Sequence, residues 1–280
     1  MTVGRAISLF LIDGVPDGRV ACELFNWTGK ALRIPRKLVK ESADRLDLQR
    51  AGVYFLFGRD DARNEANSAY VGEAEDVIRR VPQHQEKDFW TEALLFVSKD
   101  ENLNRAHIQF LEYTIYTTAL KVGRYEVRND RTPTRPAISE VEQAVMTEFF
   151  ANLQLLVGAL GYKIFEPLVS PTSSEDDEYH ISAARGANAR AVFGSEGLVV
   201  LKGSEAAGSV VPSTPESVTR LRQLLAEEGV LAAQNGSLVF AKDYLFSSPS
   251  AAAGVVLGRS ANGWVEWKNQ IGRTLKENEE

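Results

Sequence analysis

The sequence predicts a mixed α/β protein with two domains, and three observations support this. Strand-like and helical segments alternate between residues 51 and 136. Further strands and helices occupy residues 180–280, which we expect to form a separate, smaller α+β domain. Between these regions, residues 170–179 form an acidic stretch that is poor in apolar side chains, as linkers are. With 280 residues, of which 44% are hydrophobic, the chain can bury a core in each domain.

Three strands are predicted in the first domain. Residues 51–57 are aromatic or β-branched and end at Gly58, and residues 68–72 form the return strand after a polar hairpin loop at 59–67. Residues 90–98 form the third strand. We therefore expect a three-stranded sheet flanked by helices.

Two helices accompany these strands. Residues 73–76 provide an acidic first turn for a helix that Pro82 is expected to end near residue 81. After residues 99–104, a second helix has an apolar stripe with helical spacing, and Glu112 lies at the edge of that stripe. The stripe consists of Ile108, Leu111, Ile115 and Ala119.

The flanking segments have their own signals. Residues 1–50 read as a hairpin, with strands at 7–11 and 19–25, followed by a basic helix that ends near Arg50. Residues 137–169 contain a connecting helix that opens with a capping box, Ser139 to Glu142. Its predicted apolar positions are Val145, Phe149, Leu153 and Leu156. In the second domain we expect strands at 187–193, 197–202 and 238–241, and an amphipathic helix at 216–228.

Two tyrosine-containing tripeptides mark the first domain: Gly-Val-Tyr at 52–54 and Tyr-Val-Gly at 70–72. Arg80 follows Tyr70 by ten residues and His84 comes four later; Glu112 and Asn129 lie downstream. This series resembles the GIY-YIG nuclease family, whose name records the two tripeptides. The resemblance implies a metal-dependent DNA endonuclease with Glu112 as the metal ligand. It implies catalytic roles for Tyr54, Tyr70, Arg80, His84 and Asn129.

The chemistry of these side chains agrees with phosphodiester hydrolysis. Glu112 is a hard oxygen ligand suited to Mg²⁺ or Mn²⁺, and a bound ion can activate water. Arg80 is always charged and matches phosphate oxygens with its planar fork. A tyrosine has an ordinary pKa of about 10, which a nearby ion and arginine lower. We favour Tyr54 as the base that His84 relieves of its proton, with Tyr70 as an orienting partner; the opposite assignment of the tyrosines stays open.

Each of these residues alone has an ordinary explanation, such as a core tyrosine or a solvated arginine, and only their joint occurrence favours a nuclease. His107 and His180 have no such context and are predicted to be ordinary polar residues. The alternative is a catalytically silent DNA-binding or partner-binding protein that keeps the fold. A third class is a stress or defence scaffold whose second domain binds another protein.

Composition and charge limit the classes of function that the chain can have. The net charge of −6 does not indicate nucleic-acid binding, but local basic clusters can attract a polyanion. One cluster contains Arg33, Arg36, Lys37 and Lys40, and the other contains Lys121, Arg124, Arg128, Arg131 and Arg135. The single Cys22 excludes an internal disulfide, and no Walker-type loop predicts a nucleotide cofactor. No apolar run reaches about eighteen residues, so we expect a cytoplasmic protein without membrane contact.

The end of the chain carries a second resemblance. Ser248 and Pro249 read as a helix N-cap and first position, and residues 262–264 are Asn-Gly-Trp. These residues resemble a C-terminal domain of unassigned function that often follows GIY-YIG domains, and they are similar to the RAMA domains of restriction and methylation enzymes. Trp264 or Trp267 could stack on a base, although tryptophans on a strand after an Asn-Gly turn are more often core residues. Residues 1–50 similarly resemble an N-terminal extension of some bacterial GIY-YIG proteins.

Overall fold

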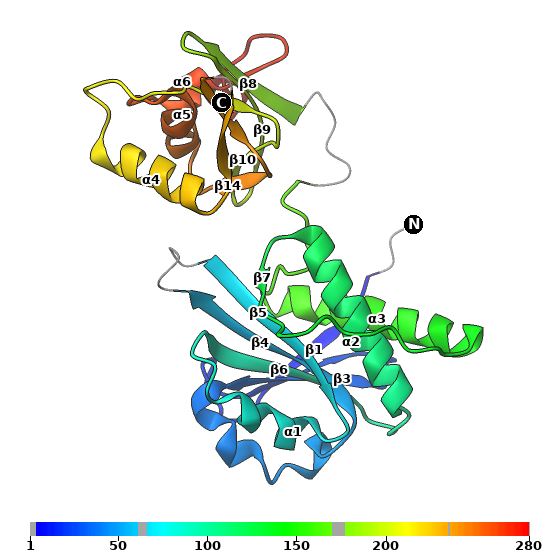
Figure 1. Ribbon diagram of the computed structural model, residues 1–280. Coiled ribbons are helices and arrows are strands. Elements are labelled where there is room, and N and C mark those ends of the chain that lie inside the picture. The colour runs from blue at the N-terminus through cyan, green and yellow to red at the C-terminus, as the bar shows by residue number, and fades with distance from the viewer. Residues whose placement is uncertain (1–3, 61–65, 170–176, 235, 280) are drawn as a thin grey trace. The chain divides into compact units, whose positions relative to one another are not determined.

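The computed structural model describes residues 4–60, 66–169, 177–234 and 236–279, and the chain divides into two units (Figure 1). The first unit is Met1–Glu166 and the second is Pro167–Glu280. The boundary therefore precedes the predicted linker at 170–179, of which residues 170–176 lie outside the described residues.

A seven-stranded sheet forms the centre of the first unit. Its strand order is β1-β2-β3-β6-β4-β5-β7, and all neighbours are antiparallel except the parallel pair β5 and β7. The bounds are β1 Ile7–Leu11, β2 Val20–Leu24, β3 Gly29–Pro35, β4 Gly52–Asp60, β5 Ala66–Ala74, β6 Trp90–Ser98 and β7 Glu126–Val127.

The predicted strands β4, β5 and β6 are present, but the sheet has seven strands and not the three that were expected. β3 pairs with β6 along its full length, from Gly29 opposite Ser98 to Pro35 opposite Glu92, and thereby joins the N-terminal hairpin to the sheet. The predicted basic helix before Arg50 is also wrong. After β3 the chain makes three short 3₁₀ turns, Arg36–Leu38, Lys40–Ser42 and Leu46–Leu48. Pairing with β6 decides the conformation of residues 29–35, a tertiary effect that local propensity does not contain.

The two faces of the sheet are covered by different elements. Val53, Phe55 and Phe57 on β4 pack into the core that contains α2 (Arg105–Val122) and α3 (Glu140–Ala159). Tyr54 and Leu56 point to the opposite face, which is covered by α1 (Val77–Arg80) and the 3₁₀ turns (Figure 1). Because strand side chains alternate between faces, β4 contributes to both layers, and Tyr54 belongs to the α1 side.

Helices α2 and α3 largely follow the prediction. The stripe of α2 is fully buried, and the capping box of α3 forms between Ser139 and Glu142. In α3, however, Val145 is 53% exposed and Met146 is buried in its place. His107 caps α2 together with Asn104 and lies 3.3 Å from Glu142 of α3. It is therefore a structural polar residue, as predicted.

The second unit contains an eight-stranded sheet, ordered β12-β13-β11-β9-β10-β14, with β8 pairing with β9 and β15 pairing with β8. The strands are β8 Glu178–Ala183, β9 Ala187–Gly194, β10 Gly197–Val200, β11 Glu205–Ala206, β12 Leu231–Gln234, β13 Ser237–Phe240, β14 Tyr244–Phe246 and β15 Lys268–Asn269. The helices are α4 Glu216–Glu227, α5 Pro249–Leu257, α6 Gly263–Glu266 and α7 Leu275–Glu279. The three predicted strands, the amphipathic helix and the Ser248 cap are all present.

The two tryptophans of the second unit differ. Trp267 is fully buried and donates a hydrogen bond to the carbonyl of Pro249 at 3.1 Å. Trp264 is 37% exposed and packs edge-on against Phe193. The predicted strand at Trp264 is wrong, because Asn262 caps the short helix α6 through its side chain. Across the described ranges of both units, no helix has the length and apolar character needed to span a membrane.

Candidate active site

Tyr54 and Tyr70 lie on the same face of the sheet. In the β4–β5 register Tyr54 is opposite Gly72 and Leu56 is opposite Tyr70, so the two tyrosines are diagonal neighbours. Their ring centroids are 6.3 Å apart and the planes are inclined by 24°. Gly72 makes this possible, because a Cβ at this position would overlap the ring and hydroxyl of Tyr54.

His84 completes an aromatic trio with the tyrosines. α1 ends at Arg80, close to the predicted end near residue 81, but the chain then continues as a 3₁₀ turn, Val81–His84, with Pro82 in its first positions. The turn brings His84 into a buried position, where Nε2 lies 2.7 Å from the Tyr54 hydroxyl. The His84 ring centroid is 4.8 Å from that of Tyr70. The proline therefore does not remove His84 from the site.

Arg80 acts on the same hydroxyl. Burial raises the pKa of Tyr54, and the positive charge of Arg80 and its hydrogen bond to the Tyr54 side chain both act against this rise; the guanidinium also donates to Gln83. Asp76, in the expected acidic first turn, does not take part in this contact. Asp76 instead caps α1 through the backbone N–H of Arg79 and pairs with the Arg79 side chain at 3.3 Å. The spacing thus selects Arg80 for the site and leaves Arg79 at the surface.

Glu112 lies half-buried on α2, and its carboxylate neighbour is Glu73, which was not among the predicted site residues. Burial and the charge of Glu73 raise the pKa of Glu112 to about 7, and Arg80 opposes the shift. Glu73 was expected in the first turn of a helix, but it belongs to β5. There it alternates with Gly72 and shares the α2-facing side with Val71. Counting alternate side chains along the strand from Tyr70 would have placed Glu73 on this side of the sheet.

The carboxylates fit a hard divalent ion. Mg²⁺ is usually held by one or two carboxylates and keeps several waters. A cation would remove the repulsion that raises the pKa of Glu112, which is the ordinary behaviour of a carboxyl pair at an ion site. Within the described ranges, no three or more His, Cys, Asp or Glu side chains are grouped so as to enclose an ion. Glu112, with Glu73 beside it, is therefore the candidate ligand for Mg²⁺ or Mn²⁺.

The side chain of Asn129 hydrogen-bonds to the backbone of β5. Its Oδ1 accepts a hydrogen bond from the backbone N–H of Val71 at 3.0 Å, and its Nδ2 donates to the Val71 carbonyl at 2.8 Å. These bonds extend the parallel pairing of β7 with β5, where Ser68 and Ala69 face Glu126 and Val127. Asn129 thus fixes the strand next to Tyr70 and is a positioning residue.

The resting protonation states follow from burial. Burial, and secondarily Tyr70, raise the pKa of Tyr54, and they outweigh the opposite influence of Arg80. Burial lowers the pKa of His84 to about 4, with Arg80 and Lys87 acting in the same direction. At neutral pH the phenol is protonated and the imidazole is neutral, so the Tyr54 O–H donates to His84 Nε2. Arg80 by itself therefore does not produce the accessible phenolate expected beside an ion.

Arg36 holds the segment that follows His84. Its Nη1 donates to the carbonyls of Lys87 at 2.8 Å and Trp90 at 3.0 Å, and its Nη2 donates to that of Gln85 at 2.6 Å. The guanidinium also lies 4.5 Å above the Trp90 ring, whose Nε1 donates to the His84 carbonyl at 3.0 Å. Arg36 was predicted as part of a DNA-attracting cluster, but its donors are occupied by this loop.

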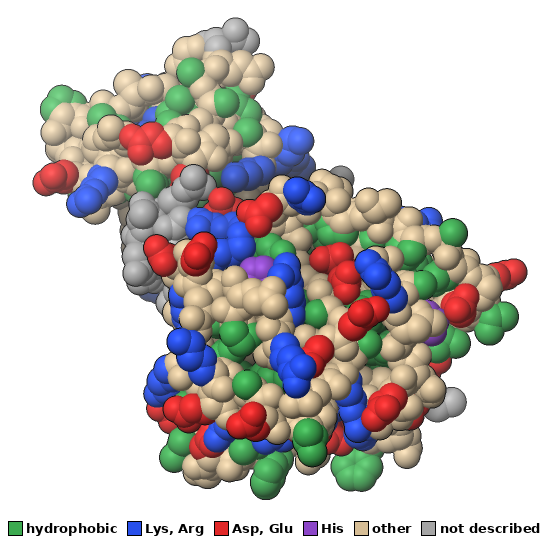
Figure 2. All heavy atoms as spheres, turned by 60° about the horizontal axis from the view of Figure 1, so that its bottom comes forward, with side chains coloured by type: hydrophobic (Ala, Val, Ile, Leu, Met, Phe, Trp, Pro, Cys, Tyr) green, Lys and Arg blue, Asp and Glu red, His purple; other side chains and the backbone are tan. Residues whose placement is uncertain are grey.

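The other basic residues do not gather into one continuous surface on the face shown in Figure 2, where basic and acidic side chains are interspersed around a histidine. Arg33 donates to the carbonyls of Pro16 and Gly18. Arg128 pairs with Glu126 at 2.9 Å. Arg135 lies 5.7 Å above the ring of Phe110. Local contacts thus engage members of both predicted basic clusters.

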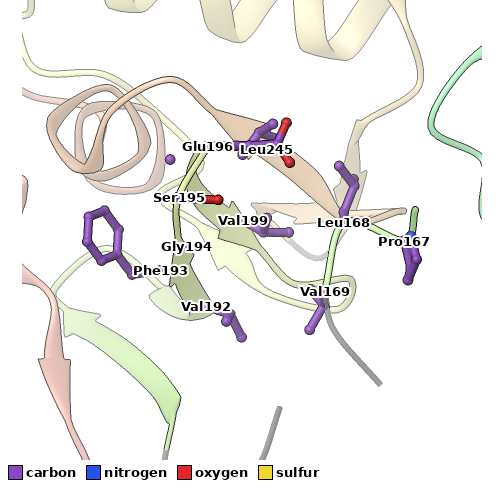
Figure 3. A pocket seen from close by; sticks show the side chains of 11 residues that line it. Pro167, Leu168, Val169, Val192, Phe193, Gly194, Ser195, Glu196, Val199 and Leu245 are labelled. Atoms are coloured by element: carbon purple, nitrogen blue, oxygen red, sulfur yellow. The ribbon is translucent and has the colours of Figure 1, made fainter. Parts of the chain in front are cut away.

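The second unit has a hollow of about 390 Å³ (Figure 3). Residues 167–169, the turn between β9 and β10, and Leu245 line it. Among the described residues that line the hollow, Glu196 is the only titratable side chain, so it offers no pair of groups for acid–base catalysis. His180, on β8, has a buried Nε2 without a hydrogen-bond partner in the described structure and does not line the hollow.

Comparison with known proteins gives a match in the second unit. No curated protein and no solved structure matches the chain. Residues 179–279 are similar to a domain of unknown function, DUF4357.

Proposed function

We propose that the protein is a metal-dependent endonuclease that hydrolyses phosphodiester bonds in DNA. One observation carries the proposal: the Tyr54 hydroxyl contacts both a neutral histidine and an arginine. The half-buried carboxyl of Glu112 interacts electrostatically with both tyrosines and with Arg80. Side chains suited to accept a proton, to bind phosphate and to hold a metal ion thus come from segments far apart in the sequence, which supports the proposal.

The chain's own groups divide the reaction between them. Arg80 binds the phosphate and stabilises the negative charge that develops on its oxygens. Tyr54 accepts a proton from the attacking water while its own proton moves to His84 Nε2 across the 2.7 Å contact. The phosphate's negative charge offsets Arg80 and so makes His84 more basic than in the free protein. Tyr70, stacked beside Tyr54, orients the base.

Glu112 would hold the divalent ion, which supplies polarisation of the phosphate and a more acidic water. Glu112 must be ionised to act as a ligand. Since its pKa is about 7, the carboxyl is close to half-protonated at neutral pH, and ion binding displaces the remaining protons.

A catalytically silent DNA-binding or partner-binding protein is the second candidate. The observation in its favour is the burial of Tyr54, which is only 1% exposed. A general base must reach its water, so a silent protein would keep the trio as a hydrogen-bonded core.

We further propose that the second unit recruits or discriminates DNA and that the protein acts in the cytoplasm. The role of the second unit is supported by the resemblance of residues 248–253 and 262–264 to domains that accompany nucleases and methylation enzymes. Trp264 is 37% exposed and is the aromatic side chain on which a base would stack.

The direct test is nicking of supercoiled plasmid in Mg²⁺ or Mn²⁺ by the wild type, Arg80→Ala and Glu112→Gln. Arg79→Ala is the matched control, because Arg79 is adjacent, 71% exposed and paired with Asp76. We expect nicking by the wild type and the control, and its loss in the other two variants. Equal activity in all four proteins would end the catalytic proposal. DNA binding without cleavage would support the silent alternative, and no salt-sensitive DNA binding would support a protein scaffold.

A further inference from the structure

Lys87 is a cation beside the aromatic trio that neither the motif nor the proposed mechanism includes. Its Nζ lies 5.3 Å from the centroid of the Tyr70 ring and 2.8 Å from Oδ2 of Asp130. Burial lowers the pKa of His84 most, the charges of Arg80 and Lys87 act in the same direction, and the charge of Asp130 opposes them. Two cations, Arg80 and Lys87, therefore act on the same histidine.

The backbone around Lys87 is held in place. Its carbonyl accepts a hydrogen bond from Arg36 at 2.8 Å, and its N–H donates to the His84 carbonyl at 3.1 Å. A change of partner at the ammonium therefore needs movement of the side chain and not of the backbone. A lysine on a fixed backbone beside a reactive centre is preorganised for an anion, because little backbone entropy is lost when the anion binds.

Asp130, the partner of Lys87, is the exposed member of the pair. Its side chain is 72% exposed, whereas that of Lys87 is 26% exposed. Asp130 directly follows Asn129, whose amide is fixed to Val71, so this carboxylate is also carried by an anchored backbone. Ion pairs open to solvent contribute little to stability, which makes this contact easy to exchange.

We infer that Lys87 is a phosphate-binding residue of the site and that Asp130 occupies its ammonium until a DNA phosphate replaces the carboxylate. This inference rests on the proposed function and adds a substrate contact to it. The exchange matches charge for charge: an exposed carboxylate leaves, and a phosphate oxygen takes over the same donor. The phosphate would then take the place of Asp130, whose charge already opposes the effect of Arg80 and Lys87 on His84.

The test measures binding of a short DNA duplex to the full-length protein by fluorescence anisotropy, in EDTA to prevent cleavage, over a series of sodium chloride concentrations. We expect Lys87→Ala to weaken binding roughly tenfold and to reduce the slope of log K against log salt by about 0.9, the value for one lost phosphate contact. Asp130→Asn should strengthen binding, because it removes a competing carboxylate. Lys87→Arg should retain wild-type binding.

A second ion pair in the same unit supplies the control. Lys99 and Glu23 are also 2.8 Å apart and exposed, but they do not lie beside the trio. Lys99→Ala and Glu23→Gln should leave affinity and salt slope close to those of the wild type. If Lys87→Ala and Lys99→Ala behave alike while the wild type binds DNA, the inference is overturned and the proposed function stands. If the wild type does not bind DNA, both fall.

Discussion

The ring of Tyr54 lies directly across Gly72, its partner in the β4–β5 register. Any side chain at Gly72 would occupy the space of the tyrosine ring and hydroxyl. The glycine of the second tripeptide is therefore required by the tyrosine of the first, and the two motifs form one packing unit.

Gly72→Ala should displace Tyr54 from His84 and abolish nicking. We expect a destabilisation of about 1–3 kcal/mol, the usual range for an inserted methyl group in a packed site. Gly194→Ala is the control, since a Cβ at Gly194 meets no atom within 4 Å. Plasmid nicking and thermal unfolding measure both effects. Wild-type activity in Gly72→Ala would show that the hydroxyl position does not matter.

His84 should give the protein an acid-sensitive stability. Its pKa falls from 6.5 to about 4 on folding, so the unfolded chain binds more protons between these values. The contribution of neutral His84 is complete above pH 6.5 and is lost as the pH falls toward 4, by up to about 3 kcal/mol.

Urea unfolding of the wild type and His84→Gln from pH 7 to 4 checks this prediction. The wild type should lose stability more steeply than the variant. Parallel curves would mean that His84 titrates near its ordinary value in the folded protein.

The raised pKa of Glu112 predicts that the affinity of the site for a metal ion depends on pH. With a pKa near 7, the carboxyl binds a proton that the ion must displace, so affinity for Mn²⁺ should rise up to about tenfold per pH unit below 7 and level off above it. Calorimetry in buffers of different ionisation enthalpy would detect the released proton. Glu112→Gln should abolish both binding and release, and retained proton release in this variant would assign the ion to other ligands.

The same carboxyl should affect stability without metal. Its folded pKa is raised from 4.5, so stability is lost as the pH rises from 4.5 through 7. Glu112→Gln should remove this loss and unfold at a higher temperature than the wild type at pH 8 in EDTA. An unchanged melting temperature would argue against the burial and the repulsion from Glu73.

Arg36 should be needed for the geometry of the site without touching substrate. Arg36→Ala breaks donation to three carbonyls, at a cost of about 1.5–3 kcal/mol for each charge-assisted bond left without a replacement. Arg36→Lys should not restore activity, because an ammonium lacks the planar fork. Lys37→Ala, at an exposed neighbouring position, should behave like the wild type. Melting temperature, nicking and the NMR titration of His84 separate a moved histidine from simple loss of folding.

The sequence by itself determined the strand segments at 52–57, 68–72 and 90–98, the stripe of α2 and the caps at Ser139 and Ser248. These depend on local alternation, helical spacing and side-chain capping, which short segments carry. Both strands of the hairpin are longer than predicted, since β4 and β5 extend into the expected loop at 59–67 and β5 also includes Glu73 and Ala74. The motif also selected Arg80 over Arg79, in agreement with the arrangement of the site.

Only the tertiary structure decided the rest. The strand at 29–35 exists because β6 offers it a partner, and Glu73 meets Glu112 because β5 packs against α2. Arg36 holds the loop after His84, and Lys87 lies beside Tyr70, although they come from a 3₁₀ turn and a loop without any motif. Burial also set the proton positions on Tyr54 and His84, since desolvation depends on neighbours from the whole fold.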